Sequence, residues 1–331
     1  MPVDSDALAA RYRDAILDRS SKRILVSKIA GSEQEADLTV PANGGGLGRV
    51  RHFRRAGTAG WPENPLPIDP AAKALDLGFR LPEIEAQVFQ NAACNWRCWY
   101  CFVPFSLLRA DRERSAWLSA GDLVDSFLAN ENGPRVLDLS GGQPELTPEW
   151  VLMVMDELER RNTSGVYLWS DDNLSTDFFW RHLAPAQQTR IAQFRPYGRV
   201  CCFKGFDEES FAFNTAASAG LFERQFSLMR RYLSTGIDLY AYVTLTSRSR
   251  NDMLARVEHF MDRLQAVHVN LPLRTVPLEV QTFTPVESRI NGERREALKI
   301  QYEVVEIWKE LLRQRFSSEQ RSLPITEISL A

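Results

Sequence analysis

The chain of 331 residues contains only five cysteines and four histidines, and none of its apolar runs is long. A membrane-spanning helix needs about 20 consecutive apolar residues, whereas the runs here, such as residues 151–155, are only a few residues long. The sequence therefore predicts no transmembrane helix. Its first residues are charged and lack the apolar segment of a secretory signal. We therefore expect a cytoplasmic protein whose thiols stay reduced and form no disulfide framework.

The sequence also has no excess of positive charge. Its formal net charge is −3 and its isoelectric point is about 5.9, which argues against a general nucleic-acid binder. There is one local exception, because residues 41–60 hold several basic side chains and no acidic one. Such a segment indicates either an anion-binding site or a solvated loop. The candidate substrate-binding residues in it are Arg49, Arg51, His52 and Arg54.

Regular elements are sparse in the first quarter of the sequence. We expect a helix at residues 6–19 and a short strand at 23–26. The stretch 41–70 is rich in glycine and proline, and it is predicted to contain no regular element. Residues 1–83 are therefore interpreted as a loop-rich N-terminal extension.

From residue 84 onward, short β-branched runs alternate with amphipathic helical patterns. The predicted strands cover residues 86–90, 136–140, 166–170, 199–204, 237–244 and 278–283. Alternation of this kind implies parallel strands joined by right-handed crossovers. The predicted fold is α/β: an open, partial (β/α)6 barrel over residues 84–290, followed by a closing helix and tail at 291–331. In parallel barrels the active site lies at the C-terminal ends of the strands, where the N-terminal extension could act as a lid.

The segment 91–105, NAACNWRCWYCFVPF, holds three of the five cysteines and directly follows the first predicted strand. Cys94, Cys98 and Cys101 have the spacing C-x3-C-x2-C. A structural zinc site usually takes four ligands in two pairs, and the adjacent Cys201 and Cys202 are poorly placed to supply the second pair. Three thiolates can instead hold a 4Fe–4S cluster and leave one iron open, and an open position is where a metal centre does chemistry.

This spacing, with Tyr100 just before the third cysteine, resembles the signature of the radical S-adenosylmethionine (SAM) superfamily. The resemblance implies that the three cysteines bind one 4Fe–4S cluster and that SAM chelates the fourth iron through its amino and carboxylate groups. It also implies an electron donor such as flavodoxin or ferredoxin. One electron then cleaves SAM to a 5′-deoxyadenosyl radical, which abstracts a hydrogen atom from the substrate.

A second motif follows the second predicted strand, where the sequence reads SGGQP. Two glycines allow the backbone to approach a ligand closely, although the same pair also suits a plain tight turn. The superfamily has a Gly-Gly-Glu-Pro motif at this place, which binds the SAM amino group. The resemblance departs from that pattern at one position, since a glutamine stands where glutamate is common. The cofactor-binding candidates here are Ser140, Gly141, Gly142 and Gln143, together with Tyr100.

The resemblance implies further SAM contacts at the ends of later strands. The candidates for the ribose, carboxylate and adenine groups are Ser170, Asp172, Asn173, Gln281 and Phe283. The residues that follow the third strand also suit a helix cap. Lys204 ends the fourth strand and would meet the SAM carboxylate or an anionic substrate. Tyr240 on the fifth strand either contacts substrate or packs outward, so Lys204 and Tyr240 are the catalytic candidates.

Three functions remain open from the sequence. The first is a radical SAM enzyme acting on a small-molecule or nucleotide-like substrate. The second is an activating enzyme that installs a glycyl radical on a partner protein, because the segment around Lys204 resembles the pyruvate formate-lyase-activating-enzyme-like branch. The third is a zinc-binding structural module with no catalytic activity. Iron and sulfide content separates the first two functions from the third.

Overall fold

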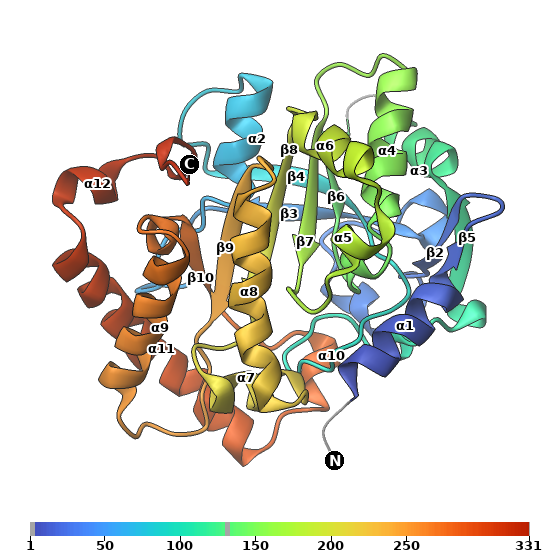
Figure 1. Cartoon of the computed structure of the whole chain (residues 1–331). Coiled ribbons are helices and arrows are strands. Elements are labelled where there is room, and N and C mark those ends of the chain that lie inside the picture. Colours follow the sequence, from blue (N-terminus) through green and yellow to red (C-terminus); the bar gives the residue numbers. More distant parts are fainter. Residues whose placement is uncertain (1–3, 130–132, 331) are drawn as a thin grey trace.

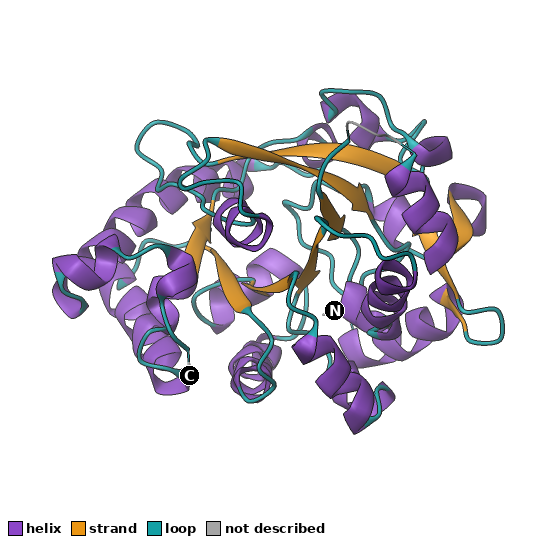
Figure 2. Ribbon diagram, turned by 90° about the horizontal axis from the view of Figure 1, so that it is seen from above, coloured by secondary structure: helices purple, strands orange, loops and turns teal. Residues whose placement is uncertain are grey.

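The computed structural model describes residues 4–129 and 133–330. A seven-stranded sheet has the order β10-β9-β8-β7-β6-β4-β3, and every strand except β3 runs parallel to its neighbours. The sheet curves into an open arc with helices along its outer side (Figure 1, Figure 2). Its strands are β3 (Gly48–Arg54), β4 (Glu83–Phe89), β6 (Val136–Leu139), β7 (Tyr167–Asp172), β8 (Tyr197–Phe203), β9 (Leu239–Thr244) and β10 (Thr275–Leu278). The predicted α/β class and open partial barrel agree with this arrangement.

Several of the helices between the strands, such as α4 and α8, are amphipathic. In α8, Phe222, Phe226 and Met229 recur at helical spacing and are buried against the sheet. A capping box between Ser119 and Asp122 fixes the start of α3. The helices are α1 (Ser5–Ile16), α2 (Ile68–Leu75), α3 (Ala120–Leu128), α4 (Glu149–Arg160), α5 (Phe178–His182), α6 (Pro185–Gln193), α7 (Glu208–Thr215), α8 (Phe222–Leu233), α9 (Met253–Val267), α10 (Thr284–Glu287), α11 (Gly292–Arg315) and α12 (Ser318–Ser322). None of the described helices is long and apolar enough to cross a membrane.

A small antiparallel sheet lies beside the main one, in the order β1-β2-β5. It consists of β1 (Leu17–Asp18), β2 (Arg23–Ser27) and β5 (Ser115–Ser119). The strand expected at residues 23–26 is therefore confirmed. The first helix begins and ends earlier than expected, because Asp4 accepts a hydrogen bond from the Ala7 amide and the chain enters β1 at Leu17.

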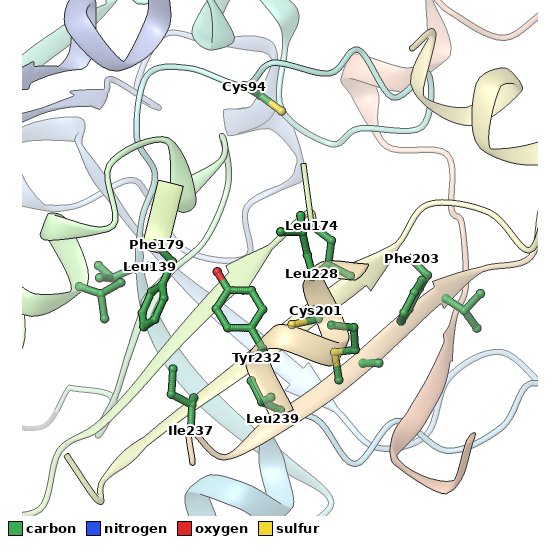
Figure 3. Close-up of a cluster of buried hydrophobic side chains, with 14 of the residues drawn as sticks. Cys94, Leu139, Leu174, Phe179, Cys201, Phe203, Leu228, Tyr232, Ile237 and Leu239 are labelled. Carbon is green, nitrogen blue, oxygen red and sulfur yellow. The ribbon is translucent and has the colours of Figure 1, made fainter. Parts of the chain in front are cut away.

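The two largest hydrophobic clusters lie on opposite faces of the curved sheet. On the outer face, Leu139, Cys201 and Leu239 pack against Leu228 and Tyr232 of α8 (Figure 3). On the inner face, the cluster includes Ala86, Val136, Tyr167, Val200 and Tyr240, together with Leu66 and, from α2, Ile68, Ala71 and Leu75. The inner face is therefore partly filled by α2, and the remaining space lies toward the C-terminal ends of the strands.

Two expectations from the sequence are wrong. The stretch 41–70 contains regular structure, because β3 pairs along its whole length with β4 and α2 starts at Ile68. Glycines flank β3 and obscure its strand pattern, and its pairing partner β4 begins only at Glu83, far along the chain from Arg54. The sixth parallel strand is 275–278 rather than 278–283. Pro277 lies inside it, which is tolerated because β10 is an edge strand that pairs only with β9.

Candidate functional site

The cysteine loop follows the C-terminal end of β4 and opens into a cavity of about 720 Å³. All three cysteines are free thiols that line this cavity, and Cys94 and Cys98 are buried. Other parts of the cavity wall come from the ends of the following strands. These residues are Gly141, Gly142, Asp171, Asn173, Cys202, Lys204 and Tyr242. The structure thus brings the cysteine motif and the glycine motif to one site, as the sequence predicts.

Hydrogen bonds from Arg97 within the loop and Arg289 outside it hold the cysteine segment in place. The Arg97 guanidinium donates to the carbonyl oxygens of Cys94 and Trp96, and to the Tyr12 hydroxyl oxygen 2.7 Å away. Arg289 donates to the Cys101 carbonyl oxygen at 2.7 Å. Because backbone carbonyls accept these bonds, the loop is fixed without using the thiols, which stay available to a metal.

Burial is the largest influence on all three thiols of the loop. It raises the pKa of Cys98 to about 12 and raises the pKa values of Cys94 and Cys101, while the charge of Lys204 acts in the opposite direction. Cys101 reinforces the rise in the pKa of Cys94, and Cys94 and Cys101 both reinforce the rise in that of Cys98. Buried thiols of this kind ionise readily only when a metal cation replaces their protons.

No three Cys, His, Asp or Glu side chains in the described part of the chain are arranged to hold a single metal ion. A 4Fe–4S cluster makes a different demand, because each of its thiolate ligands binds a different iron. Three free thiols on one loop, facing one cavity, fit that demand.

Gly141 and Gly142 adopt backbone conformations that only glycine accepts easily. Their φ angles are +86° and +69°. A Cβ atom at Gly142 would lie 2.0 Å from Asn91 Oδ1 and 2.5 Å from the Asn91 carbonyl oxygen. The glycine pair therefore lets the backbone after β6 pass directly against the start of the cysteine loop while it lines the cavity.

The Gln143 side chain is fully buried and lies behind the cavity wall. Its Nε2 donates to Asp172 Oδ1 at 2.9 Å and to Ser175 Oγ at 3.2 Å, and its Oε1 accepts from the Asn173 amide at 3.0 Å. Both the nitrogen and the oxygen of the Gln143 side-chain amide thus make hydrogen bonds within the protein. Gln143 positions the loop after β7, and a direct contact of its side chain with SAM is not what this geometry favours.

Strand alternation decides which residues at the end of β7 reach the site. Asp171 and Asn173 line the cavity, and Asn173 Nδ2 lies 3.7 Å from Cys94 Sγ. Ser170 points to the opposite face, where its hydroxyl is 2.7 Å from the Tyr197 hydroxyl, and Asp172 is bonded to Gln143. Ser140 is likewise buried, with its hydroxyl donating to Asp138 at 2.9 Å. The sequence analysis did not identify Asp171 as a site residue. Side chains two apart on a strand share a face, so Asp171 could have been inferred from the candidate Asn173.

The two catalytic candidates lie in different places. Lys204 lines the cavity; burial opposes its charge, while the neighbouring Cys202, Tyr100 and Cys98 raise the pKa of its ammonium group. The Tyr240 ring packs 5.7 Å from that of Trp169, and its hydroxyl donates to Asp238 at 2.7 Å. Tyr240 is therefore placed in the inner core below the cavity, and Tyr242 two residues later reaches the site.

Tyr100 and the residues after β10 complete the wall. The Tyr100 hydroxyl lies 2.9 Å from Thr244 Oγ1, which ties the cysteine loop to the end of β9. Gln281 and Phe283 both line the cavity, and the Phe283 ring is 6.3 Å from that of Phe102. Across the cavity stands β3, so the basic segment noted in the sequence belongs to the wall of this site.

Comparison with known proteins gives limited similarity. No family model matches the chain, and no curated protein does. Among solved structures, Streptococcus suis SuiB bound to S-adenosylmethionine is 16% identical, with a TM-score of 0.44 over 68% of this chain and 46% of that one. SuiB bound to the precursor peptide SuiA is 14% identical, with a TM-score of 0.45 over 69% of this chain and 46% of that one. The chain thus matches less than half the length of these structures.

Proposed function

We propose that this chain is a radical SAM enzyme whose 4Fe–4S cluster is held by Cys94, Cys98 and Cys101. The observation that carries the proposal is the opening of three free thiols, spaced C-x3-C-x2-C, into one cavity beside a glycine pair of positive φ. When bound and reduced, the cluster with SAM would supply a 5′-deoxyadenosyl radical for hydrogen abstraction. An external one-electron donor, such as flavodoxin or ferredoxin, is part of the proposal.

The chain's own residues have distinct roles around that chemistry. Backbone carbonyls near Gly141 and Gly142 would accept hydrogen bonds from the SAM amino group, and the Lys204 ammonium would pair with the SAM carboxylate. Asn173 offers an amide to either the ribose or a cysteine sulfur. Phe102 and Phe283 form an apolar wall on the side where the adenine is expected.

The test is direct. Protein purified without oxygen should be brown and contain close to four irons and four sulfides per chain, since each cubane holds four of each. After reduction it should convert SAM to 5′-deoxyadenosine. Colourless protein with one zinc per chain would instead support the structural zinc module. A reduced, iron-loaded protein that leaves SAM intact would refute the proposed activity.

A further inference from the structure

Strand β3 divides its basic residues between the two faces of the sheet. His52 and Arg54 stand opposite Glu85 and Glu83 of β4, with nitrogen–oxygen distances of 3.3 and 3.6 Å. These two bases are therefore balanced by acids on the outer face. Arg49 and Arg51 alternate with them and stand opposite the apolar Val88 and Ala86. They share the inner face of the sheet and line the cavity, whose lining also includes the acid-paired His52 and Arg54.

Arg49 is buried without a full set of partners. Its side chain is only 8% exposed, and its Nε and Nη2 atoms have no hydrogen-bond acceptor among residues 4–129 and 133–330. Within the same residues, no carboxylate lies within 4 Å of the Arg49 or Arg51 guanidinium groups. Leaving a buried cation without acceptors is costly, so the arrangement favours a ligand that supplies them.

The nearby charged groups do not supply the acceptors that the Arg49 guanidinium group lacks. Burial and the repulsion of Arg51 lower the pKa of Arg49, while Asp138 and Asp171 act in the opposite direction from further away. Burial also raises the pKa of Asp138 to about 7, so part of that negative charge is absent near neutral pH. Lys204 lines the same cavity, as do Arg54 and the acids Asp37, Asp171 and Glu279. An incoming anion would relieve the repulsion between the two arginines as well as the cost of burying them.

Both guanidinium groups also pack on the cysteine loop. The Arg49 and Arg51 Cζ atoms lie 4.9 and 5.9 Å from the centre of the Phe102 ring, and Phe102 directly follows Cys101. Cation–π contacts fix the planes of guanidinium groups. The N–H groups that remain free are thus held beside the site where the proposed radical would form.

We propose that Arg49 and Arg51 together bind an oxyanion of the substrate, either a carboxylate or a phosphate, and so anchor one end of the substrate beside the cysteine loop. That the anion belongs to the substrate of a radical SAM reaction rests on the proposed function. The oxyanion site itself rests only on β3 and its surroundings. Guanidinium groups bind both carboxylates and phosphates through paired N–H donors. Experiment must therefore decide which of these two groups the site prefers.

Isothermal titration calorimetry on the anaerobic holoenzyme tests the site. The titrants are inorganic phosphate and propionate, at constant ionic strength, with and without saturating SAM. Arg51→Gln should weaken binding of the preferred anion roughly tenfold or more, the usual loss for a charge-assisted hydrogen bond. Arg54→Gln is the control, because Arg54 also lines the cavity but is exposed and already paired with Glu83; it should change binding less than about twofold. Arg49→Lys keeps the positive charge but removes the planar guanidinium group, which can donate two parallel hydrogen bonds. We therefore expect a loss of anion affinity between those of the other two variants.

The outcomes are separable. Tighter binding of phosphate than of propionate identifies a phosphate-bearing substrate, and tighter binding of propionate identifies a carboxylate. Equal losses of anion affinity in Arg51→Gln and Arg54→Gln would overturn the proposal, because binding would then depend only on the total positive charge around the cavity. Displacement of the anion by SAM, or no binding of either titrant, would also overturn it. Formation of 5′-deoxyadenosine by the same samples reports on the proposed function independently, and circular dichroism confirms that each variant is folded.

Discussion

The Gln143 side-chain oxygen accepts a hydrogen bond from the backbone amide of Asn173, 3.0 Å away. This contact joins the turn after β6 to the turn after β7, and Asn173 in turn reaches Cys94. The glycine motif, the third strand end and the cysteine loop are therefore one connected unit. A change at Gln143 should act on all three, even though its side chain does not face the cavity.

The first prediction concerns Gln143→Glu, a change toward the residue that is common in the superfamily motif. It should destabilise this protein, because a carboxylate oxygen would replace the Nε2 group that donates to Asp172. We expect a loss of about 2 kcal/mol or more in the free energy of unfolding, together with weaker SAM binding and an unchanged iron content. Urea denaturation and calorimetry with SAM measure these quantities. Equal stability of variant and wild type would contradict the assigned hydrogen bonds.

The second prediction separates the cysteines by position. Cys98→Ala should abolish cluster assembly and 5′-deoxyadenosine formation, because only two thiols of the motif remain. Cys201→Ala is the control, since Cys201 is buried on the outer face among Leu139 and Leu228 (Figure 3). This variant should keep a full complement of iron. Its free energy of unfolding should fall only modestly, because removal of the sulfur atom leaves a small cavity in the core. Iron analysis and absorption spectra of both variants check this, and iron loss in both would argue against the assignment.

The third prediction uses two glycines with similar backbone angles. Gly142 has φ +69° and no room for a Cβ atom, whereas Gly236 has φ +81° and nothing within 4 Å of that position. Gly236→Ala should cost about 1 kcal/mol, the penalty of the backbone conformation alone. Gly142→Ala should cost several times more, because the Asn91 backbone must move. Similar losses of unfolding free energy in the two variants would show that the close approach to the cysteine loop is not rigid.

Much of the fold and part of the site follow from the sequence for identifiable reasons. The cysteine spacing and the glycine pair are local in the chain, so their place after β4 and β6 could be predicted. Which face of the sheet each strand residue occupies could not be predicted. An error of one residue in the position of a strand moves every side chain to the other face. Ser170 and Asp172 were preferred to Asp171 for that reason. The position of Arg49 and Arg51 in the cavity depends on β3 pairing with β4, which is a long-range contact that local patterns do not encode.

The fourth prediction concerns pH. Asp138 is buried on the inner face beneath the cavity, and burial, reinforced by Asp171, raises its pKa from the ordinary 3.8 to about 7. The folded protein thus holds this proton more tightly than the unfolded chain does. Between about pH 4 and pH 7 the unfolded state releases the proton first, so the contribution of Asp138 to stability falls as pH rises through this window.

Asp138→Asn should remove that dependence, because an amide has no proton to lose and can still accept the hydrogen bond from Ser140. At pH 4, the start of this window, the variant and the wild type should have similar unfolding free energies. At pH 8 the variant should be more stable by about 2 kcal/mol, since each pKa unit corresponds to about 1.4 kcal/mol and relaxation of the site reduces the full effect. Denaturation curves at both pH values, on protein without cluster or SAM, measure the difference. A variant that is less stable than the wild type at pH 8 would mean that the ionised Asp138 carboxylate, facing Arg49 and Arg51, stabilises the fold.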